Sequence, residues 1–309
     1  MSILSRRGFL VGCGQTFGSL ALLGVSARAL ARAGQASIVS TDLGGGLTLL
    51  SGAGCNVVAL ASTEGALLVD GGLAEHSAGL LSAATRATRA KRVHTLINTH
   101  WHPEQTGSNE RVGRDGGVIF SHENTRLWLG RASRLTGSDS TYGPLAPKGR
   151  PTQTTRGDGS LDFGGQRIDY GYLPQAHTDG DLYVHFREQD VLVAGGPFAG
   201  NGWPLLDIRN GAWIGGTMRA FEKLAAVAGP KTRVVSAQGS SLGARADIER
   251  HRDMYTTLYN RLMDELNKGM GPDDVVAKRV AQEYEPAMGD ASAFLDLAFR
   301  SLALAYAPD

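Results

Sequence analysis

The chain contains little cysteine and carries almost no net charge. Its 309 residues include two cysteines, and 31 basic against 30 acidic side chains leave a formal charge of +1. This balance gives no reason to expect a nucleic-acid partner. The hydrophobic and charged contents, 42% and 20%, are those of an ordinary globular protein, and the length suffices for one large domain.

Acidic side chains are absent from residues 1–33. This segment contains Arg6 and Arg7, then an apolar run rich in glycine and alanine, then small-residue cleavage candidates. It resembles a twin-arginine export signal, which leaves residues 34–309 as the folded domain. The run is short for a membrane span, so we expect cleavage rather than an uncleaved anchor, and a periplasmic protein with no stable membrane anchor. Cys55 would then be the only cysteine, and no internal disulfide is expected.

Long apolar runs are also missing from the remaining chain. Short apolar runs between tight turns predict strands, at residues 47–51, 56–61, 66–69, 93–98, 118–120, 161–163, 166–172, 182–186, 191–194 and 232–235. Helical periodicity is found over residues 74–89, 214–227, 247–267, 272–283 and 291–305. Hairpins followed by helices, twice over, favour an α/β sandwich rather than a doubly wound sheet.

Residues 130–160 have no periodicity and are dominated by Gly, Ser, Thr, Pro and Arg. A segment of this length inside a compact domain is often a lid or a binding loop. It can equally be plain surface, and the sequence leaves both interpretations open.

Histidine is scarce, with eight residues in all, yet His100 and His102 are separated by a single residue at the end of the predicted strand 93–98. Two imidazoles in this position can turn toward one point. Neutral imidazole is the commonest metal ligand among protein side chains, and zinc takes nitrogen ligands in tetrahedral sites. An isolated His-x-His pair can also be a strand end without metal.

Four landmarks extend this pattern, and each closes an apolar run. They are Val-Asp-Gly-Gly at 69–72, Thr-His-Trp-His-Pro-Glu-Gln-Thr-Gly at 99–107, Ala-His-Thr-Asp-Gly-Asp at 176–181, and Val-Val-Ser-Ala-Gln-Gly at 234–239. Because these four landmarks occur in this order, the chain resembles the metallo-β-lactamase-fold metallohydrolase superfamily over roughly residues 40–245. The resemblance implies a four-layer αββα sandwich, followed here by a helical C-terminal extension over about 247–309.

The resemblance also implies a metal site, because three histidines match the ligands of the family's first metal: His100, His102 and His177. The second site is altered at four positions. Where the family has Asp, His, a bridging Asp and a last His, this chain has Glu104, Gln105, Gly196 and Gln238. The expected cofactor is therefore zinc, one ion per chain, with an open fourth position.

Further roles follow from the resemblance. Glu104 is the candidate to orient or deprotonate the attacking water. Asp70 and Asp181 are candidates to fix the histidine tautomers, or else a turn former and a loop cap. The side chains of Trp101, Trp203 and Trp213 either line a substrate cleft or pack in the core and rim.

We expect a hydrolase that cleaves an ester, lactone or amide bond in a small molecule. The alternative is a degenerate member of the fold that binds a ligand or a partner. An iron dioxygenase of this fold would take its metal from two histidines and the late Asp, and that position is Gly196 in this chain.

Overall fold

The structure is a computed structural model that describes residues 37–200, 202–239 and 242–306. The chain divides into two units, Met1–Gln35 and Ala36–Asp309, and all described residues belong to the second. The predicted export segment, residues 1–33, lies outside them. Among the described helices, none has the length and apolar character needed to cross a membrane.

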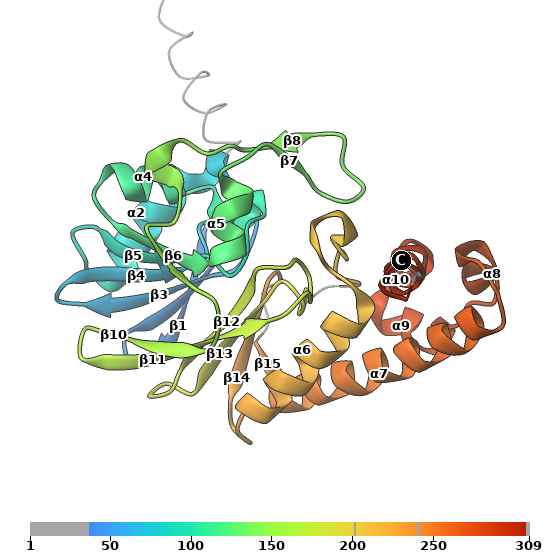
Figure 1. The fold of residues 1–309 in the computed structure, drawn as a ribbon. Helices are drawn as coiled ribbons and strands as arrows, with labels where there is room; N and C mark the ends of the chain where they lie inside the picture. The colour runs from blue at the N-terminus through green and yellow to red at the C-terminus, as the bar shows by residue number, and fades with distance from the viewer. Residues whose placement is uncertain (1–36, 201, 240–241, 307–309) are drawn as a thin grey trace, which may run out of the picture. The chain divides into compact units, whose positions relative to one another are not determined.

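Two β-sheets form the centre of the fold (Figure 1). The seven-stranded sheet has the order β1 (Val39–Gly44), β2 (Leu47–Ser51), β3 (Val57–Ser62), β4 (Gly65–Val69), β5 (Val93–Ile97), β6 (Val118–His122), β9 (Gln153–Thr155). The six-stranded sheet has the order β10 (Gly159–Phe163), β11 (Gln166–Leu173), β12 (Asp181–Phe186), β13 (Val191–Gly195), β14 (Arg233–Ser236), β15 (Gly243–Ala244). A separate hairpin pairs β7 (Ser133–Arg134) with β8 (Thr141–Tyr142).

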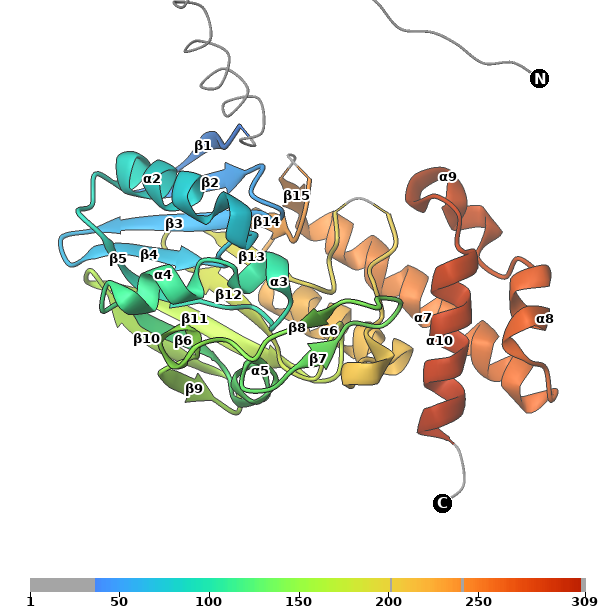
Figure 2. The same cartoon turned by 90° about the horizontal axis from the view of Figure 1, so that it is seen from above.

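Helices cover the outer faces of both sheets (Figure 2). The α-helices are α2 (Ser77–Thr88), α3 (Pro103–Thr106), α4 (Asn109–Arg114), α5 (Glu123–Leu129), α6 (Ile214–Val227), α7 (Arg245–Asn267), α8 (Pro272–Ala277), α9 (Glu285–Met288) and α10 (Ser292–Ala305). Short 3₁₀ segments lie at Ala74–His76, Pro147–Gly149, Ile208–Asn210 and Gln282–Tyr284.

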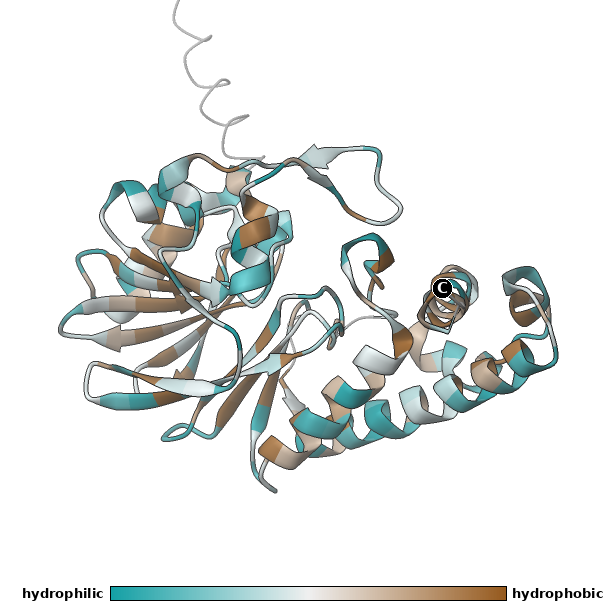
Figure 3. Cartoon of the chain, viewed as in Figure 1, coloured by the Kyte–Doolittle hydropathy of each residue, from teal (hydrophilic) through white to brown (hydrophobic). Residues whose placement is uncertain are grey.

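Three apolar layers hold these elements together. One lies between the two sheets and includes Leu60 and Val184. A second joins the outer face of the seven-stranded sheet to α2 and includes Leu80. The third joins the outer face of the six-stranded sheet to α6, α7 and α10 and includes Phe221, and the strands of both sheets are accordingly rich in apolar residues (Figure 3). This confirms the predicted αββα sandwich.

The parallel strands explain where a site forms. β4, β5 and β6 pair in parallel in one sheet, and β13 pairs in parallel with β14 in the other. Ligands in such sheets bind outside the carboxyl ends of the strands. Asp70, His100, Gly196 and Gln238 all follow these ends closely in the sequence.

Some predicted elements differ from those observed. The helix expected over 74–89 begins as the 3₁₀ segment Ala74–His76 and ends before Arg89, whose φ of 54° is left-handed. The helix expected over 272–283 ends at Ala277, and Arg279 with φ 50° interrupts its continuation. Residues 130–160, without periodicity in the sequence, contain the β7–β8 hairpin, a 3₁₀ segment and β9.

Candidate metal centre

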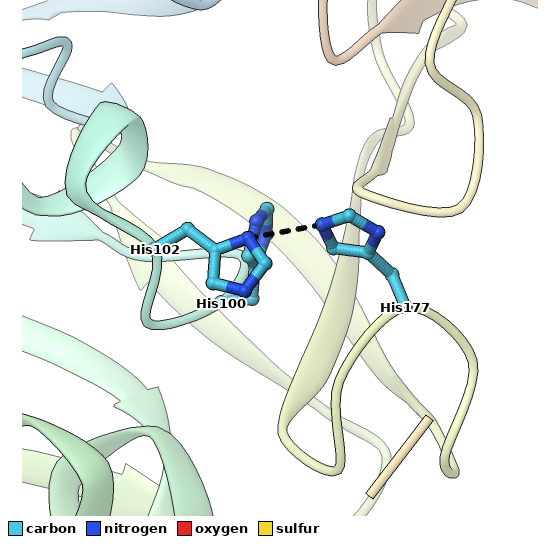
Figure 4. Close-up of side chains that lie close together, drawn as sticks. All are labelled: His100, His102 and His177. Atoms are coloured by element: carbon cyan, nitrogen blue, oxygen red, sulfur yellow. Dashed lines mark hydrogen bonds between the residues drawn. The ribbon is translucent and has the colours of Figure 1, made fainter. Parts of the chain in front are cut away.

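Three histidines from two loops converge at the carboxyl ends of the strands. His100 and His102 follow β5, and His177 precedes β12. Their exposed fractions are 1%, 1% and 7%, and one ring nitrogen of each lies within 4.8 Å of the other two. Figure 4 shows the three rings turned toward a common point. The cluster can therefore hold a metal ion, as the sequence predicted.

His102 is held by hydrogen bonds at both ring nitrogens. Its Nε2 lies 2.9 Å from Asp207 Oδ2, and its Nδ1 lies 3.1 Å from His177 Nε2. A carboxylate only accepts hydrogen bonds, so we assign the proton to Nε2. Nδ1 then presents its lone pair to the other two histidines.

His100 faces the cluster with its other nitrogen. Its Nδ1 lies 3.1 Å from Thr99 Oγ1, while its Nε2 is buried and has no hydrogen-bond partner among the described residues. Burial and the neighbouring histidines lower the pKa of His100 well below its usual value. Burial and His102 lower the pKa of His177 to about 3. Both rings are therefore neutral at physiological pH, which is the form that binds metals.

The spacing of the ring nitrogens fits a tetrahedral metal. Zinc–nitrogen bonds of 2.0–2.1 Å place two ligands of a tetrahedron about 3.3 Å apart. The 3.1 Å separation of His102 Nδ1 and His177 Nε2 is close to that edge. The unpartnered Nε2 of His100 is a third donor without another function among the described residues. The residues present thus fit a metal held by three imidazoles.

Asp207 is a site residue that the sequence analysis missed. Its side chain is fully buried, and it accepts hydrogen bonds from His102 Nε2, from the backbone and hydroxyl of Thr136, and from Asn210 Nδ2. Burial raises the pKa of Asp207, but these hydrogen bonds outweigh it and hold the pKa below its ordinary value. Asp207 is the sole acidic residue between Asp190 and Glu222, which is the one sequence signal that could have singled it out.

Asp70 and Asp181, the two carboxylates predicted to fix the histidine tautomers, contact backbone N–H groups and a hydroxyl rather than an imidazole ring. Asp70 accepts hydrogen bonds from Thr99 N and Thr99 Oγ1 at 2.8–3.0 Å, so it reaches His100 only through Thr99. Asp181 accepts hydrogen bonds from the backbone N–H groups of His177 and Thr178. These contacts favour the loop-cap alternative for Asp181 and give Asp70 an indirect position behind His100.

Glu104 and Gln105 lie on α3 next to the cluster. Glu104 Oε1 is 3.8 Å from His102 Nδ1, and its side chain is 25% exposed. Gln105 is 1% exposed, and its Oε1 has no hydrogen-bond partner among the described residues. Gln238, at the last histidine position of the family, is exposed.

Gly196 has no room for a side chain. A Cβ atom built on it would lie 2.3 Å from Cδ2 of His177 and 3.1 Å from Cε1 of His100. Carbon atoms of different residues do not approach to 2.3 Å in folded proteins. The position that carries the bridging Asp in the family is therefore sterically closed by the ring of His177.

A small cavity of about 130 Å³ opens beside the histidines. Its described lining residues are His100, His102, Glu104, Gln105, His177, Gly196, Ala199, Trp203, Pro204, Leu205, Ala237 and Gln238. Of the three tryptophans that were candidates to line a substrate cleft, Trp203 lines this cavity. Trp101 is fully buried and stacks on Trp128, and Trp213 packs against Tyr259.

The family model of the metallo-beta-lactamase superfamily matches residues 50–239. This segment contains every strand end that forms the site and is more than half of the chain. The protein belongs to the metallo-beta-lactamase superfamily. No curated protein matches the sequence.

Solved structures of the same fold are similar to this chain. A metallo-beta-lactamase from Pontibacter korlensis shares 20% identity over 71% of this chain and 99% of its own, with a TM-score of 0.57. A metallo-beta-lactamase from Hirschia baltica shares 16% identity over 71% and 97%, with a TM-score of 0.56. A double mutant of the sec-alkyl sulfatase PisA1 shares 14% identity over 88% of this chain, with a TM-score of 0.63, and this chain spans half the length of that sulfatase. At these identities the likeness shows the fold.

Proposed function

We propose that this protein is a metal-dependent hydrolase that holds one zinc ion per chain and cleaves an ester, lactone or amide bond in a small molecule. The observation that supports this proposal is the cluster of three buried imidazoles with the Glu104 carboxylate 3.8 Å away, at the wall of a cavity. Zinc with three nitrogen ligands keeps an open position, acts as a Lewis acid and makes water acidic near neutral pH.

The residues of the chain supply the rest of the mechanism. Burial keeps His100 and His177 neutral, and Asp207 holds the Nδ1 lone pair of His102 toward the cluster. Glu104 is part of the cavity wall and partly exposed, so it can accept a hydrogen bond from water and remove its proton. Its side chain is one methylene longer than the Asp of the family, and its Oε1 lies 3.8 Å from His102 Nδ1.

Metal content tests the single-site proposal. Elemental mass spectrometry of the protein purified without a metal-binding tag should find about one zinc per chain, as three imidazoles hold one tetrahedral ion. His102→Ala, and the double variant His100→Ala/His177→Ala, should lose it, whereas Gln238→Ala should keep it. Close to two metals per chain would mean that Glu104 and Gln105 rebuild a second site. Equal loss in His102→Ala and Gln238→Ala would contradict the single-site assignment.

Hydrolysis tests the role of Glu104. Esters, lactones, amides and β-lactams should be screened with the zinc-loaded protein. Replacing Glu104 by Gln should lower kcat about 100- to 10,000-fold with zinc content unchanged, because a general base contributes this much. Unchanged kcat would remove Glu104 from the mechanism.

A second candidate is a ligand- or partner-binding module without hydrolytic activity. The four altered positions of the second metal site, Glu104, Gln105, Gly196 and Gln238, favour it. Absence of bound metal even after zinc is added back, or zinc binding without hydrolysis across the screen, would place this candidate first.

We further propose that the protein is exported to the periplasm by the twin-arginine route. The support is the Arg6-Arg7 pair before an apolar run that lacks acidic residues. The double variant Arg6→Lys/Arg7→Lys should retain the full-length protein in the cytoplasm, as measured by cell fractionation. An unchanged distribution would contradict the proposed route.

A further inference from the structure

A second hollow of the surface adjoins the histidine cavity. This groove has a volume of about 470 Å³, within the 300–1,000 Å³ typical of ligand sites, whereas the cavity of about 130 Å³ lies below that range. Gln238 lines both, with Ala237 in the wall of the cavity and Gly239 in the wall of the groove. Because Gln238 is exposed, a molecule bound at the histidines can extend across it into the groove.

The wall of the groove is polar but uncharged. None of its described lining residues carries a charge, and Ser37, Thr41 and Gln238, which are exposed, supply hydroxyl and amide groups. Gly52 and Gly54 are also exposed and present only backbone groups, since they have no side chain. Hydroxyl, amide and backbone groups provide both donors and acceptors. Such a wall is complementary to an uncharged ligand that donates and accepts hydrogen bonds, as the amides of a peptide-like chain do.

The groove follows the direction of a β-strand. Val39 and Thr41 line it and are alternate residues of β1, so their side chains lie on one face of the strand, about 7 Å apart along it. Val39 is 58% exposed and adds an apolar contact. An extended chain fits a groove of this direction better than a compact ring.

The partition between the two hollows is held in place by hydrogen bonds. Asn56 is buried, and it donates from its backbone N to Ala237 O at 2.8 Å and from Nδ2 to Ser236 O at 3.0 Å. On the other side, Gln238 N donates to Ala199 O at 3.0 Å. The backbone that carries Gln238 is therefore fixed from both sides, so the cavity and the groove keep their relative position without a ligand.

We propose that the groove is a subsite for the part of the substrate remote from the scissile bond, and that this part is an uncharged, extended chain bearing amide groups. The inference rests on the proposed function, because the subsite holds a molecule whose other end lies at the histidine cluster. Gln238 is then a residue that determines specificity, since a bound substrate passes over it between the cavity and the groove.

Hydroxamates of increasing length test the subsite by binding alone. Acetohydroxamic acid supplies the metal-binding group, and the hydroxamates of acetylated mono-, di- and triglycine extend it by one amide unit of about 3.5 Å at a time. Pentano-, octano- and undecanohydroxamic acid match these compounds in main-chain length but have no further amide. Their affinities for the zinc-loaded protein are measured by isothermal titration calorimetry.

The glycine compounds should gain affinity at the length that first reaches the groove. We expect the best of them to bind at least about fivefold more tightly than acetohydroxamic acid, because each hydrogen bond between neutral groups contributes about 2- to 10-fold. At that length the alkyl compound should bind more weakly than the glycine compound, because it makes no hydrogen bond with the wall.

Variants of the wall assign this gain to the groove. Thr41→Trp places a large ring in the groove and should abolish the gain, with acetohydroxamic acid as the reference for each variant. Ser40→Trp, at the neighbouring exposed position of β1 whose side chain points to the opposite face, should leave the gain unchanged. Gln238→Leu keeps the size of the side chain and should reduce the gain. Zinc content and melting temperature establish that each variant is folded and loaded.

The outcomes distinguish this inference from the proposed function. Equal affinity of the glycine compounds and acetohydroxamic acid, an equal or larger gain in the alkyl series, or an unchanged gain in Thr41→Trp would overturn the subsite while leaving the zinc site intact. Failure to bind zinc, and with it failure to bind acetohydroxamic acid, would overturn both.

Discussion

His102 Nε2 lies 2.9 Å from Asp207 Oδ2, although the two residues are 105 positions apart in the chain. Asp207 is in turn fixed by Thr136, which belongs to the loop between β7 and β8, and by Asn210. The orientation of an imidazole in the candidate metal centre therefore depends on a loop that the sequence showed only as a segment without periodicity.

Removing this carboxylate should weaken metal binding without removing a ligand. We expect Asp207→Ala to lower zinc affinity about 10- to 100-fold, because partners that orient a ligating histidine contribute this much. Thr136→Val should have a smaller effect in the same direction, since it removes one hydrogen bond to Asp207. Zinc affinity is measured by competition with a chelator, with Asp162→Ala, at an exposed position of β10, as the control. Wild-type affinity in Asp207→Ala would show that the hydrogen bond does not orient His102.

Restoring the bridging Asp should damage the site rather than rebuild it. In Gly196→Asp the new Cβ would lie 2.3 Å from Cδ2 of His177, so this ring must move away from the other two histidines. We expect the zinc content to fall below that of the wild type. Gly79→Asp, in α2, where a Cβ has no neighbour within 4 Å, serves as the control. A gain of a second metal in Gly196→Asp would contradict this steric explanation.

The stability of the zinc-free protein should fall as pH rises above neutrality. Burial raises the pKa of Asp70 to about 8, whereas an unfolded aspartate titrates near 3.9. Between these values the folded state binds more protons than the unfolded state, so the free energy of unfolding decreases with pH. From pH 7 to 8.5, above the titration of unfolded histidine, we expect a loss of about 1 kcal/mol.

Urea unfolding of the wild type and Asp70→Asn in the presence of a chelator measures this effect. The loss should be smaller in the variant, because Asn carries no titrating proton. Part of the loss remains, since burial raises the pKa of Asp181 to about 7 and this carboxyl titrates in the same range. Adding zinc should reduce the loss in the wild type, since a nearby positive charge lowers the pKa of a carboxyl group. An identical pH dependence in both proteins would exclude Asp70 as its source.

Trp203 should limit the size of the substrate. It lines the cavity, stacks on Phe294 of α10 with ring centroids 4.6 Å apart, and donates a hydrogen bond from Nε1 to the oxygen of Gly289 at 3.0 Å. We expect Trp203→Ala to raise kcat/KM for bulky acyl groups relative to small ones, as its removal enlarges the cavity. Trp213→Ala, which removes a tryptophan outside the cavity wall, is the control. The same acyl-size profile in both variants would show that Trp203 is not the limiting wall.

The sequence predicted those parts of the site that lie directly at strand ends. His100 and His102 could be placed because they follow a predicted strand, and all three histidines, with His177, because they match the family's ligand positions. Each lies a few residues from a strand whose pairing fixes its direction. Asp207 could not be placed, because its contact with His102 depends on how a loop without regular periodicity crosses the strand ends. Gly196 was read as a lost ligand, but the close approach of His177 that excludes a side chain there is visible only in three dimensions.

The same distinction applies to the fold. The α/β sandwich followed from short apolar runs and helical periodicity, which are local properties of the chain, whereas the order of its four αββα layers was implied by the resemblance to the superfamily. The end of α8 did not, because periodicity continues past Ala277 while Arg279 adopts a left-handed backbone. Among the three candidate tryptophans, only the packing of each ring on its neighbours showed that Trp203 faces the cavity.

The support of Trp203 by Phe294 and Gly289 comes from outside the segment, residues 50–239, that the superfamily has in common. Two enzymes could thus be identical over that whole segment, with the same histidines and the same loops, and still accept different molecules because their last helices differ. Differences in substrate selection would then arise in the C-terminal helices, which lie outside the segment that carries the histidines.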